Sequence, residues 1–304
     1  MKETDFHDWL KEYLPRARGA LIGIGDDAAV LDTSSPIAVA SDLLVEGIHF
    51  KMGEAGARQI GAKAVNRNFS DMAAMGLSPD WLLVSAAVPS LTPEAFVKDL
   101  VQGMREAADR FDAFIVGGDT SRSLHGLVID VMVIAQVGAL QPVSRSGARP
   151  GHCICVTGEL GGSLLKKHLD FIPRVSEGLF LNRFHTPSAM LDISDGLLLD
   201  LSRLLDASHV GAELTGDRIP LSDDAHETAR TSGLTPLTHA LMDGEDFELL
   251  FTVDPDTAER LMRDPRKEFR ITEIGVITPD PAQRIIKTKG RIRTFGREGY
   301  DHSI

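Results

Sequence analysis

The sequence predicts a mixed α/β (α+β) protein in two halves, with one domain over residues 1–148 and another over residues 149–304. The first observation is that apolar runs with strand character alternate with runs of helical spacing along the chain. The second is a polar stretch rich in glycine and proline, "SRSGARPGHC", which is typical of a domain boundary. The length of 304 residues also favours two domains over one.

The first half is expected to hold four strands and two long helices. Strands are predicted for "IAVASDLL", "WLLVSAAV", "DAFIVGG" and "LVIDVMVIAQVG". One helix, "GARQIGAKAVNRNFSDMAAMG", should end at Gly76 as its C-cap. A second, "TPEAFVKDLVQGMREAADRF", should begin with Thr92 as N-cap and Pro93 at the first helical position. The strand at 127–140 is partly amphipathic and could pair with another subunit.

The second half is expected to hold strands at "CICVTG", "AMLDIS", "FELLFTV" and "ITEIGVI", with helices between them. The run "VTGELGGSLL" imitates a phosphate-binding loop, but no Lys-Ser or Lys-Thr follows its glycines, which favours a tight turn. The chain contains no G-x-x-x-x-G-K-[ST] motif, so a P-loop is excluded.

Composition limits the function classes. The formal net charge is −12, from 32 basic and 44 acidic residues, which argues against a nucleic-acid binder. The N-terminus lacks the pattern of a signal peptide, and the longest apolar run carries Asp130 and Gln136, so no membrane span is predicted. Cys153 and Cys155 are interpreted as core thiols of a protein in the reducing cytoplasm.

Aspartates recur where burial is expected, at strand ends and inside apolar helices. Each could cap a helix or turn, but seven such caps are hard to explain, because caps are normally solvated and shared with Ser, Thr and Asn. The alternative is a pool of oxygen ligands for Mg²⁺, which is usually held by a few carboxylates and substrate phosphates. Glycines that permit close approach to a phosphate lie beside the same acids. These acids are Asp26, Asp27, Asp42, Asp71, Asp119, Asp192 and Asp195.

Taken together, seven motifs resemble the thiamine-monophosphate kinase family, in the superfamily of aminoimidazole ribonucleotide synthetase. They are, in order, "GIGDDAAV", "SDLLVEGIHF", "NFSDMAAMG", "VGGDTS", "SRSG", "LDISDG" and "GEDFELLFT", followed by "GYDHS" at the end. Each motif alone is weak, but the set spans nearly the whole chain. The resemblance implies a two-domain ATP-binding fold without a P-loop, whose N-terminal half dimerises through its sheet and whose C-terminal half completes the substrate site.

The resemblance also implies an activity and residue roles. Such enzymes transfer the γ-phosphoryl group of ATP directly to the phosphate of thiamine monophosphate, assisted by several Mg²⁺ ions. ATP would be met by Gly118, Asp119, Arg145 and Ser194, and the substrate by His49, Glu245 and Tyr300. The implied metal ligands are Asp27, Ser41, Asp42, Asp71, Asp119, Asp192 and Asp195.

The chemistry agrees with these roles. The acceptor phosphate is already ionised near pH 7, so no general base is assigned, and repulsion between two polyanions is the main obstacle. Metals that neutralise both phosphates address that obstacle. The thiazolium cation suits an aromatic ring such as Tyr300, and Glu245 could accept a hydrogen bond from the aminopyrimidine.

Some positions stay open. Asp26 is either a second metal ligand or a turn-capping acid, and Lys63 could serve the site or form a salt bridge within the metal cluster. Ala40 stands where the family often has a second hydroxyl, and the chain ends in "GYDHSI" where the family usually has Phe after His.

Rival functions are sister enzymes and a non-catalytic sensor. Selenophosphate synthetase should carry a reactive Cys near its N-terminus, and the hydrogenase-maturation relative should end in cysteine; this chain has neither feature. Aminoimidazole ribonucleotide synthetase lacks the "GYDH" ending and is the runner-up. A sensor would bind Mg-ATP without consuming it.

Overall fold

The computed structural model describes residues 3–24 and 28–300 and divides the chain into two units. The first unit comprises Met1–Met72, Leu77–Ala139 and Leu169–Ile172, and the second comprises Ala73–Gly76, Leu140–His168 and Pro173–Ile304. The principal change of unit therefore falls between Ala139 and Leu140, whereas the division expected from the sequence lies between residues 148 and 149. Asp26 and Asp27 lie outside the described residues.

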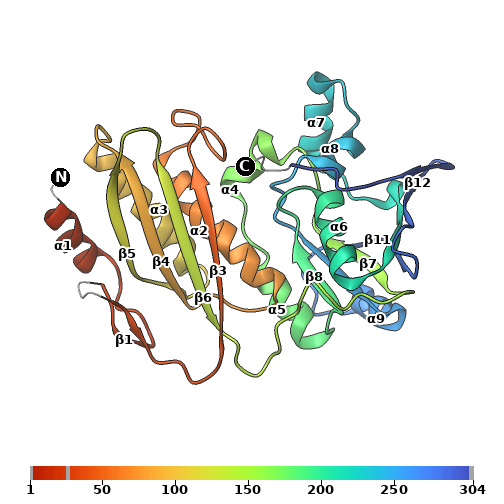
Figure 1. Cartoon of the computed structure of the whole chain (residues 1–304), viewed down its shortest axis with the longest axis horizontal. Helices are drawn as coiled ribbons and strands as arrows, with labels where there is room; N and C mark the ends of the chain where they lie inside the picture. The colour runs from red at the N-terminus through yellow and green to blue at the C-terminus, as the bar shows by residue number, and fades with distance from the viewer. Residues whose placement is uncertain (1–2, 25–27, 301–304) are drawn as a thin grey trace. The chain divides into compact units, whose positions relative to one another are not determined.

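The first unit is built on a four-stranded sheet in the order β3-β6-β4-β5. β3 pairs antiparallel with β6, β6 antiparallel with β4, and β4 parallel with β5. Helices α2 and α3 lie on one face of this sheet (Figure 1). The elements are α1 (Glu3–Tyr13), β1 (Ala20–Ile22), β2 (Val30–Leu31), β3 (Ile37–Val45), α2 (Ala57–Ala74), β4 (Trp81–Pro89), α3 (Glu94–Asp109), β5 (Phe114–Ser123) and β6 (Val128–Gln136).

Alternation along β3 gives the sheet two different faces. Leu44 is 1% exposed and packs toward the helices, whereas Val39 and Leu43 are 51% and 53% exposed on the other face. Successive residues of a strand point to opposite sides, which accounts for this pattern. Along β3, therefore, the apolar side chains of Val39 and Leu43 are left largely exposed on the face opposite the helices.

The predicted end of α2 is confirmed, whereas the predicted N-cap of α3 is wrong. Gly76 has φ +67° next to the end of α2, and the Leu77 N–H returns to the Met72 carbonyl, as expected for a glycine that stops a helix. Thr92 is not the N-cap of α3. That position belongs to Pro93, whose extended backbone precedes Glu94 and which provides no side-chain cap.

Helices α2 and α3 approach each other through two glycines. A methyl group at Gly61 would lie 2.0 Å from the Leu100 carbonyl oxygen, and one at Gly103 would lie 2.0 Å from the Arg58 carbonyl oxygen. Only the absence of a side chain allows this backbone contact.

Gly61→Ala should therefore destabilise the protein, because the two helices must separate to admit the methyl group. Overpacking of this kind costs about 1–3 kcal/mol of the free energy of unfolding. Urea denaturation measures the effect as a lower midpoint. Gly296→Ala is the control, since nothing lies within 4 Å of its added methyl group. Equal midpoints for the two variants would contradict the packing described for α2 and α3.

The second unit contains a seven-stranded sheet in the order β13-β12-β9-β11-β7-β10-β8. Its pairs are antiparallel except β12 with β9. The elements are β7 (Cys153–Thr157), η1 (Ser163–Leu165), α4 (Lys167–Asp170), α5 (Val175–Phe184), β8 (Ala189–Asp192), α6 (Leu197–Ser208), β9 (Gly211–Thr215), η2 (Gly216–Arg218), α7 (Asp223–Ser232), α8 (Pro236–Met242), β10 (Leu249–Val253), α9 (Pro255–Arg263), β11 (Ile271–Thr278), β12 (Arg284–Thr288) and β13 (Arg291–Thr294).

The core of this unit lies between α6 and the central strands. Residues of α6 such as Leu197, Leu201 and Leu204 are fully buried against Ile154 of β7 and Leu250 of β10. This packing fixes the loop between β8 and α6, which carries the motif "LDISDG". Both cysteines are free thiols, and burial raises the pKa of Cys153 to about 11, so this thiol stays protonated near neutral pH.

No helix within the described part of the chain is long and apolar enough to cross a membrane.

Candidate functional site

In the first unit, Asp42 lies on the helix-facing side of β3, beside α2. Its Oδ2 is 3.5 Å from Arg67 Nε, and its backbone N–H donates to Asn68 Oδ1 at 3.0 Å. Lys63, Arg67 and Asp71 follow at intervals of four on α2, so they share one helix face. Arg67 was not anticipated from the sequence, although its spacing from Lys63 and Asp71 could have indicated it.

Ser41 points away from Asp42. Its Oγ donates to Asp130 Oδ1 of β6 at 2.7 Å, on the face of the sheet that carries Val39 and Leu43. Neighbouring residues of a strand always alternate in this way. The structure therefore does not bring the Ser41 side chain to the same side as Asp42.

Lys63 and His49 are joined in a compact turn after β3. Lys63 is completely buried, and its Nζ donates to the His49 carbonyl at 2.8 Å. His49 in turn accepts the Val45 N–H at Nδ1, at 3.0 Å. Because Nδ1 is an acceptor here, the neutral ring carries its proton on Nε2. The sequence had left the role of Lys63 open and did not indicate its contact with this turn.

Gly118 and Asp119 line a cavity of about 780 Å³ in the first unit. Its apolar wall comes from α1, α3 and the start of β5, including Leu10, Val101 and Ile115. Asp119 is exposed, and its Oδ1 accepts the Thr120 N–H at 2.9 Å. A methyl group at Gly118 would lie 1.8 Å from the Val84 carbonyl oxygen, so close pairing of β5 with β4 requires glycine here.

In the second unit, four predicted site residues meet around the loop after β8. The Ser194 carbonyl accepts the Glu245 N–H at 2.7 Å, and the Asp195 carbonyl accepts the Tyr300 N–H at 2.9 Å. Motifs that are distant along the chain are thus joined by direct backbone hydrogen bonds. Tyr300 itself is half exposed.

Asp200 holds this loop from the other side. Its buried Oδ2 accepts the N–H groups of Ser194 and Asp195 at 3.0 and 2.9 Å, and Arg203 Nη1 bridges Asp200 Oδ1 and Asp195 Oδ2 at 2.6 Å each. Burial, with Asp192 and then Asp195 nearby, raises the pKa of Asp200 to about 7. Asp200 was missed, although an acid in the apolar run "GLLLDLSRLL" is the signal that singled out the other aspartates.

Arg145 occupies an exposed loop held by the end of α6. Ser208 Oγ donates to the Arg145 carbonyl at 3.3 Å and accepts the N–H groups of Gly147 and Ala148. The loop is fixed while the guanidinium stays at the surface.

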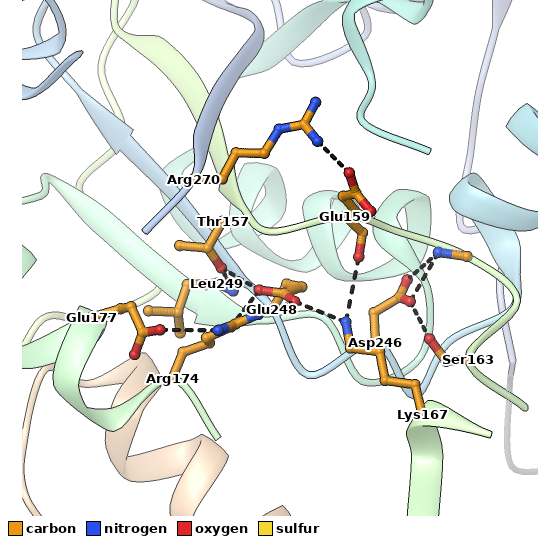
Figure 2. Close-up of polar contacts among 11 residues, drawn as sticks. Thr157, Glu159, Ser163, Lys167, Arg174, Glu177, Asp246, Glu248, Leu249 and Arg270 are labelled. Carbon is orange, nitrogen blue, oxygen red and sulfur yellow. Dashed lines mark hydrogen bonds and ion pairs between the residues drawn. The ribbon is translucent and has the colours of Figure 1, made fainter. Parts of the chain in front are cut away.

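The loop that imitates a phosphate-binding loop is occupied by the chain's own acids. The Gly161 N–H donates to both carboxylate oxygens of Asp246, at 2.9 and 3.1 Å, and Ser163 Oγ also bonds Asp246 (Figure 2). The Gly162 N–H donates to Asp243 at 3.1 Å. Backbone N–H groups that could hold a phosphate therefore bind carboxylates instead.

Glu248 lies next to this loop, is 1% exposed, and forms ion pairs with two basic side chains. Arg174 donates to both of its oxygens at 2.7 Å, Lys167 Nζ lies 2.8 Å away, and Thr157 Oγ1 donates at 2.7 Å (Figure 2). These partners lower the pKa of Glu248 although burial opposes them.

A pH dependence follows from Asp246. Burial raises its pKa from 3.8 to about 7, so the unfolded chain releases this proton at lower pH than the folded chain. The free energy of unfolding should fall as pH rises from about 4 to about 7, by on the order of 3–4 kcal/mol from this group. Asp246→Asn should remove that part of the slope.

Urea unfolding of both proteins at pH 4.5, 6 and 8, with EDTA present, measures this difference. The variant should gain stability relative to the parent protein as pH rises. A stability difference that is the same at all three values would refute the raised pKa.

The carboxylates present are of the chemical type that binds Mg²⁺. They are hard oxygen donors, and burial, together with the neighbouring Asp192 and Asp195, raises the pKa of Asp200 to about 7. Within residues 3–24 and 28–300, however, no three acids, histidines or cysteines are grouped closely enough to hold an ion by themselves. Substrate phosphates are the donors that usually complete a Mg²⁺ shell.

Comparison with known proteins gives full-length matches. Residues 25–137 match the N-terminal domain of AIR synthase related proteins, and residues 173–287 match the C-terminal domain. The thiamine-monophosphate kinase of Rhodopirellula baltica is 39% identical, over 97% of this chain and 92% of that protein.

Two solved structures support the same relationship. Thiamine-monophosphate kinase from Stenotrophomonas maltophilia superposes with a TM-score of 0.80 at 31% identity, covering 94% of this chain and 95% of that one. AaThiL, solved in complex with AMPPCP and TMP, superposes with a TM-score of 0.78 at 27% identity, covering 99% and 97%.

Proposed function

We propose a mechanism and a set of site residues from the premise that this chain belongs to the thiamine-monophosphate kinase family, with AIR synthase related N- and C-terminal domains. Its activity is the ATP-dependent phosphorylation of thiamine monophosphate to thiamine diphosphate. In our proposal the γ-phosphoryl group passes directly and in line to the substrate phosphate.

ATP is assigned first to the cavity of the first unit. Its apolar wall suits a nucleobase, and Gly118 and Asp119 are among the residues that line it. Arg145 and Ser194 are proposed as further ATP contacts. Arg145 would pair with phosphate oxygens, for which a planar guanidinium is well suited.

The substrate is assigned to His49, Glu245 and Tyr300. The observation that carries this assignment is the pair of backbone hydrogen bonds that join Glu245 to Ser194 and Tyr300 to Asp195. They bring proposed substrate residues next to proposed ATP and metal residues within one unit. His49 is assigned with them from the turn after β3, where its Nδ1 accepts the Val45 N–H at 3.0 Å and its position is fixed.

Mg²⁺ would supply charge neutralisation between the two phosphates when it is bound. We propose Asp27, Asp42, Asp71, Asp119, Asp192 and Asp195 as its ligands, and keep Ser41 and Asp26 as weaker candidates. Arg67 and Arg203 hold Asp42 and Asp195 in place, and Asp200 fixes the backbone on both sides of the Ser194–Asp195 peptide. No side chain is assigned as a general base, since the acceptor is already ionised.

We also propose that residues 1–148 form the ATP-binding and dimerising domain and residues 149–304 complete the substrate site. The exposed apolar face of β3, with Ile37, Val39 and Leu43, supports a homodimer formed through the sheet. A cytoplasmic location agrees with two free thiols and no disulfide within the described residues.

ADP release, measured with a coupled assay, tests the function against a nucleotide sensor. ADP should form only when ATP, Mg²⁺ and thiamine monophosphate are all present, and its rate should saturate with thiamine monophosphate. Binding of ATP without ADP release would assign the chain to the sensor class.

A further inference from the structure

The cavity of about 780 Å³ in the first unit has a single positively charged side chain, Lys11, among the described residues that line it. Asp119 is the one acid among them, and Ser85 and Thr120 are the only other polar side chains. The rest of this lining consists of apolar residues and glycines. A polyanion that enters such a cavity needs a cation to face it, because an uncompensated charge is disfavoured beside an apolar wall.

Lys11 is only weakly paired within the described part of the chain. Its Nζ lies 3.7 Å from Asp8 Oδ1, and the side chains of Lys11 and Asp8 are 44% and 75% exposed. An exposed pair at this distance contributes little, so the ammonium can exchange Asp8 for another anion at small cost. Lys98 of α3 is different, since its Nζ lies 2.9 Å from Glu94 Oε1.

Helix α1 fixes Lys11 beside the cavity. Phe6 and Leu10 are one helical turn apart and both line the cavity, and Lys11 directly follows Leu10. The end of α1 is anchored to α3, because Arg105 Nη1 donates to the Tyr13 carbonyl at 2.9 Å and the guanidinium lies 4.8 Å from the centre of the Tyr13 ring. The helix thereby lies beside β5 (Figure 1). Lys11 is thus held where its side chain can reach a ligand in the cavity.

We propose that Lys11 binds the phosphate chain of ATP, so that α1 contributes a binding residue to the reaction. The inference rests on the proposed function, because it takes this cavity as the ATP site. A lysine ammonium has three N–H donors and no acceptor, and it pairs directly with phosphate oxygens. Asp119 is an anion and needs a bound cation between itself and the same phosphates.

Two other roles of Lys11 make different predictions. A lysine that donates to a nitrogen of the base contacts an uncharged group, and a lysine that only supports α1 contacts no ligand. Salt screens the attraction between two charges, whereas it has little effect on the other two roles. An effect on ATP that decreases as the salt concentration rises is therefore expected only from a phosphate contact.

Steady-state kinetics of Lys11→Met at saturating thiamine monophosphate and Mg²⁺ test the proposal. In about 0.05 M KCl the KM for ATP should rise about 10- to 100-fold, the effect of losing a hydrogen bond to a charged group. The value of kcat should change by less than about threefold, because the contact is made equally in the ground state and the transition state. In about 0.5 M KCl the ratio of the two KM values should fall to less than about half.

Two further variants separate charge from structure. Lys11→Arg keeps the charge and should keep the KM for ATP within about threefold of the parent value. Lys11→Gln is a second neutral variant and should behave like Lys11→Met. Thermal unfolding without nucleotide should give the same midpoint for all of them, since residues with unbranched side chains have similar helix propensities.

Lys98→Met is the matched control, because it removes the same charge from the same unit. Its side chain is 40% exposed, close to the value for Lys11, but Lys98 is not among the residues that line the cavity. It should leave the KM for ATP within about twofold of the parent value.

The proposal is overturned if both neutral Lys11 variants keep the parent KM, if salt does not change the ratio of KM values, or if Lys98→Met raises KM equally. A parent protein that makes thiamine diphosphate while any of these results is found refutes this inference alone. A parent that consumes no ATP and makes no thiamine diphosphate refutes the proposed function as well.

Discussion

Asp119→Asn should lower kcat/KM by about 100- to 1000-fold while leaving the fold unchanged. The proposed role of Asp119 is to hold a Mg²⁺ ion that offsets charge in the transition state, and a bound metal contributes several kcal/mol there. Asparagine has nearly the same shape, and its side-chain oxygen can still accept the Thr120 N–H. The substitution therefore removes the charge and keeps the local structure.

Steady-state kinetics over a range of Mg²⁺ concentrations measure this effect. Excess Mg²⁺ should restore part of the lost activity, because a weakened site is filled by mass action. Asp109→Asn is the control, since it changes an exposed acid on α3 that pairs only weakly with Arg105 at 3.4 Å. If Asp119→Asn matched the parent at limiting Mg²⁺, Asp119 would not be a metal ligand.

Glu248→Gln should destabilise the second unit by about 3–5 kcal/mol, the usual effect of breaking a buried ion pair by removing one partner. Arg174 and Lys167 would be left beside a neutral amide in a largely buried network. Thermal or urea unfolding measures the loss, which is large enough to reduce the amount of folded protein.

A double-mutant cycle with Arg174→Met separates the pair energy from other effects. The double variant should be less destabilised than the sum of the two single variants, because no charge of this pair is then left alone. Strict additivity would show that Glu248 and Arg174 contribute independently, contrary to their two hydrogen bonds of 2.7 Å.

The strands and long helices could be predicted from the sequence because their signals are local. Apolar runs with strand character predicted β3, β4 and β6 close to their observed bounds, and Gly76 marks the end of α2 as expected. Thr92 failed as a cap because the extended backbone at the helix start falls on Pro93. Neighbouring residues share similar cap signals, so such boundaries are uncertain by a residue or two.

The partners of the site residues could not be predicted, since they join positions that are distant in sequence. Nothing near Gly161 indicates that its N–H group binds Asp246, and nothing near Lys63 indicates that it holds the His49 carbonyl. In contrast, the role of Asp200 and the side of β3 on which Ser41 lies could have been predicted. Both followed from patterns already present, an acid in an apolar helix and the alternation of a strand.

The central claim is tested most directly by ³¹P NMR of the protein with Mg²⁺, thiamine monophosphate and ATP labelled with ¹⁸O in its γ-phosphoryl group. The account predicts that the ATP signals decline as those of ADP and thiamine diphosphate grow in equal amounts. The label should appear in the terminal phosphate of thiamine diphosphate. Intact ATP with no thiamine diphosphate signal would contradict it.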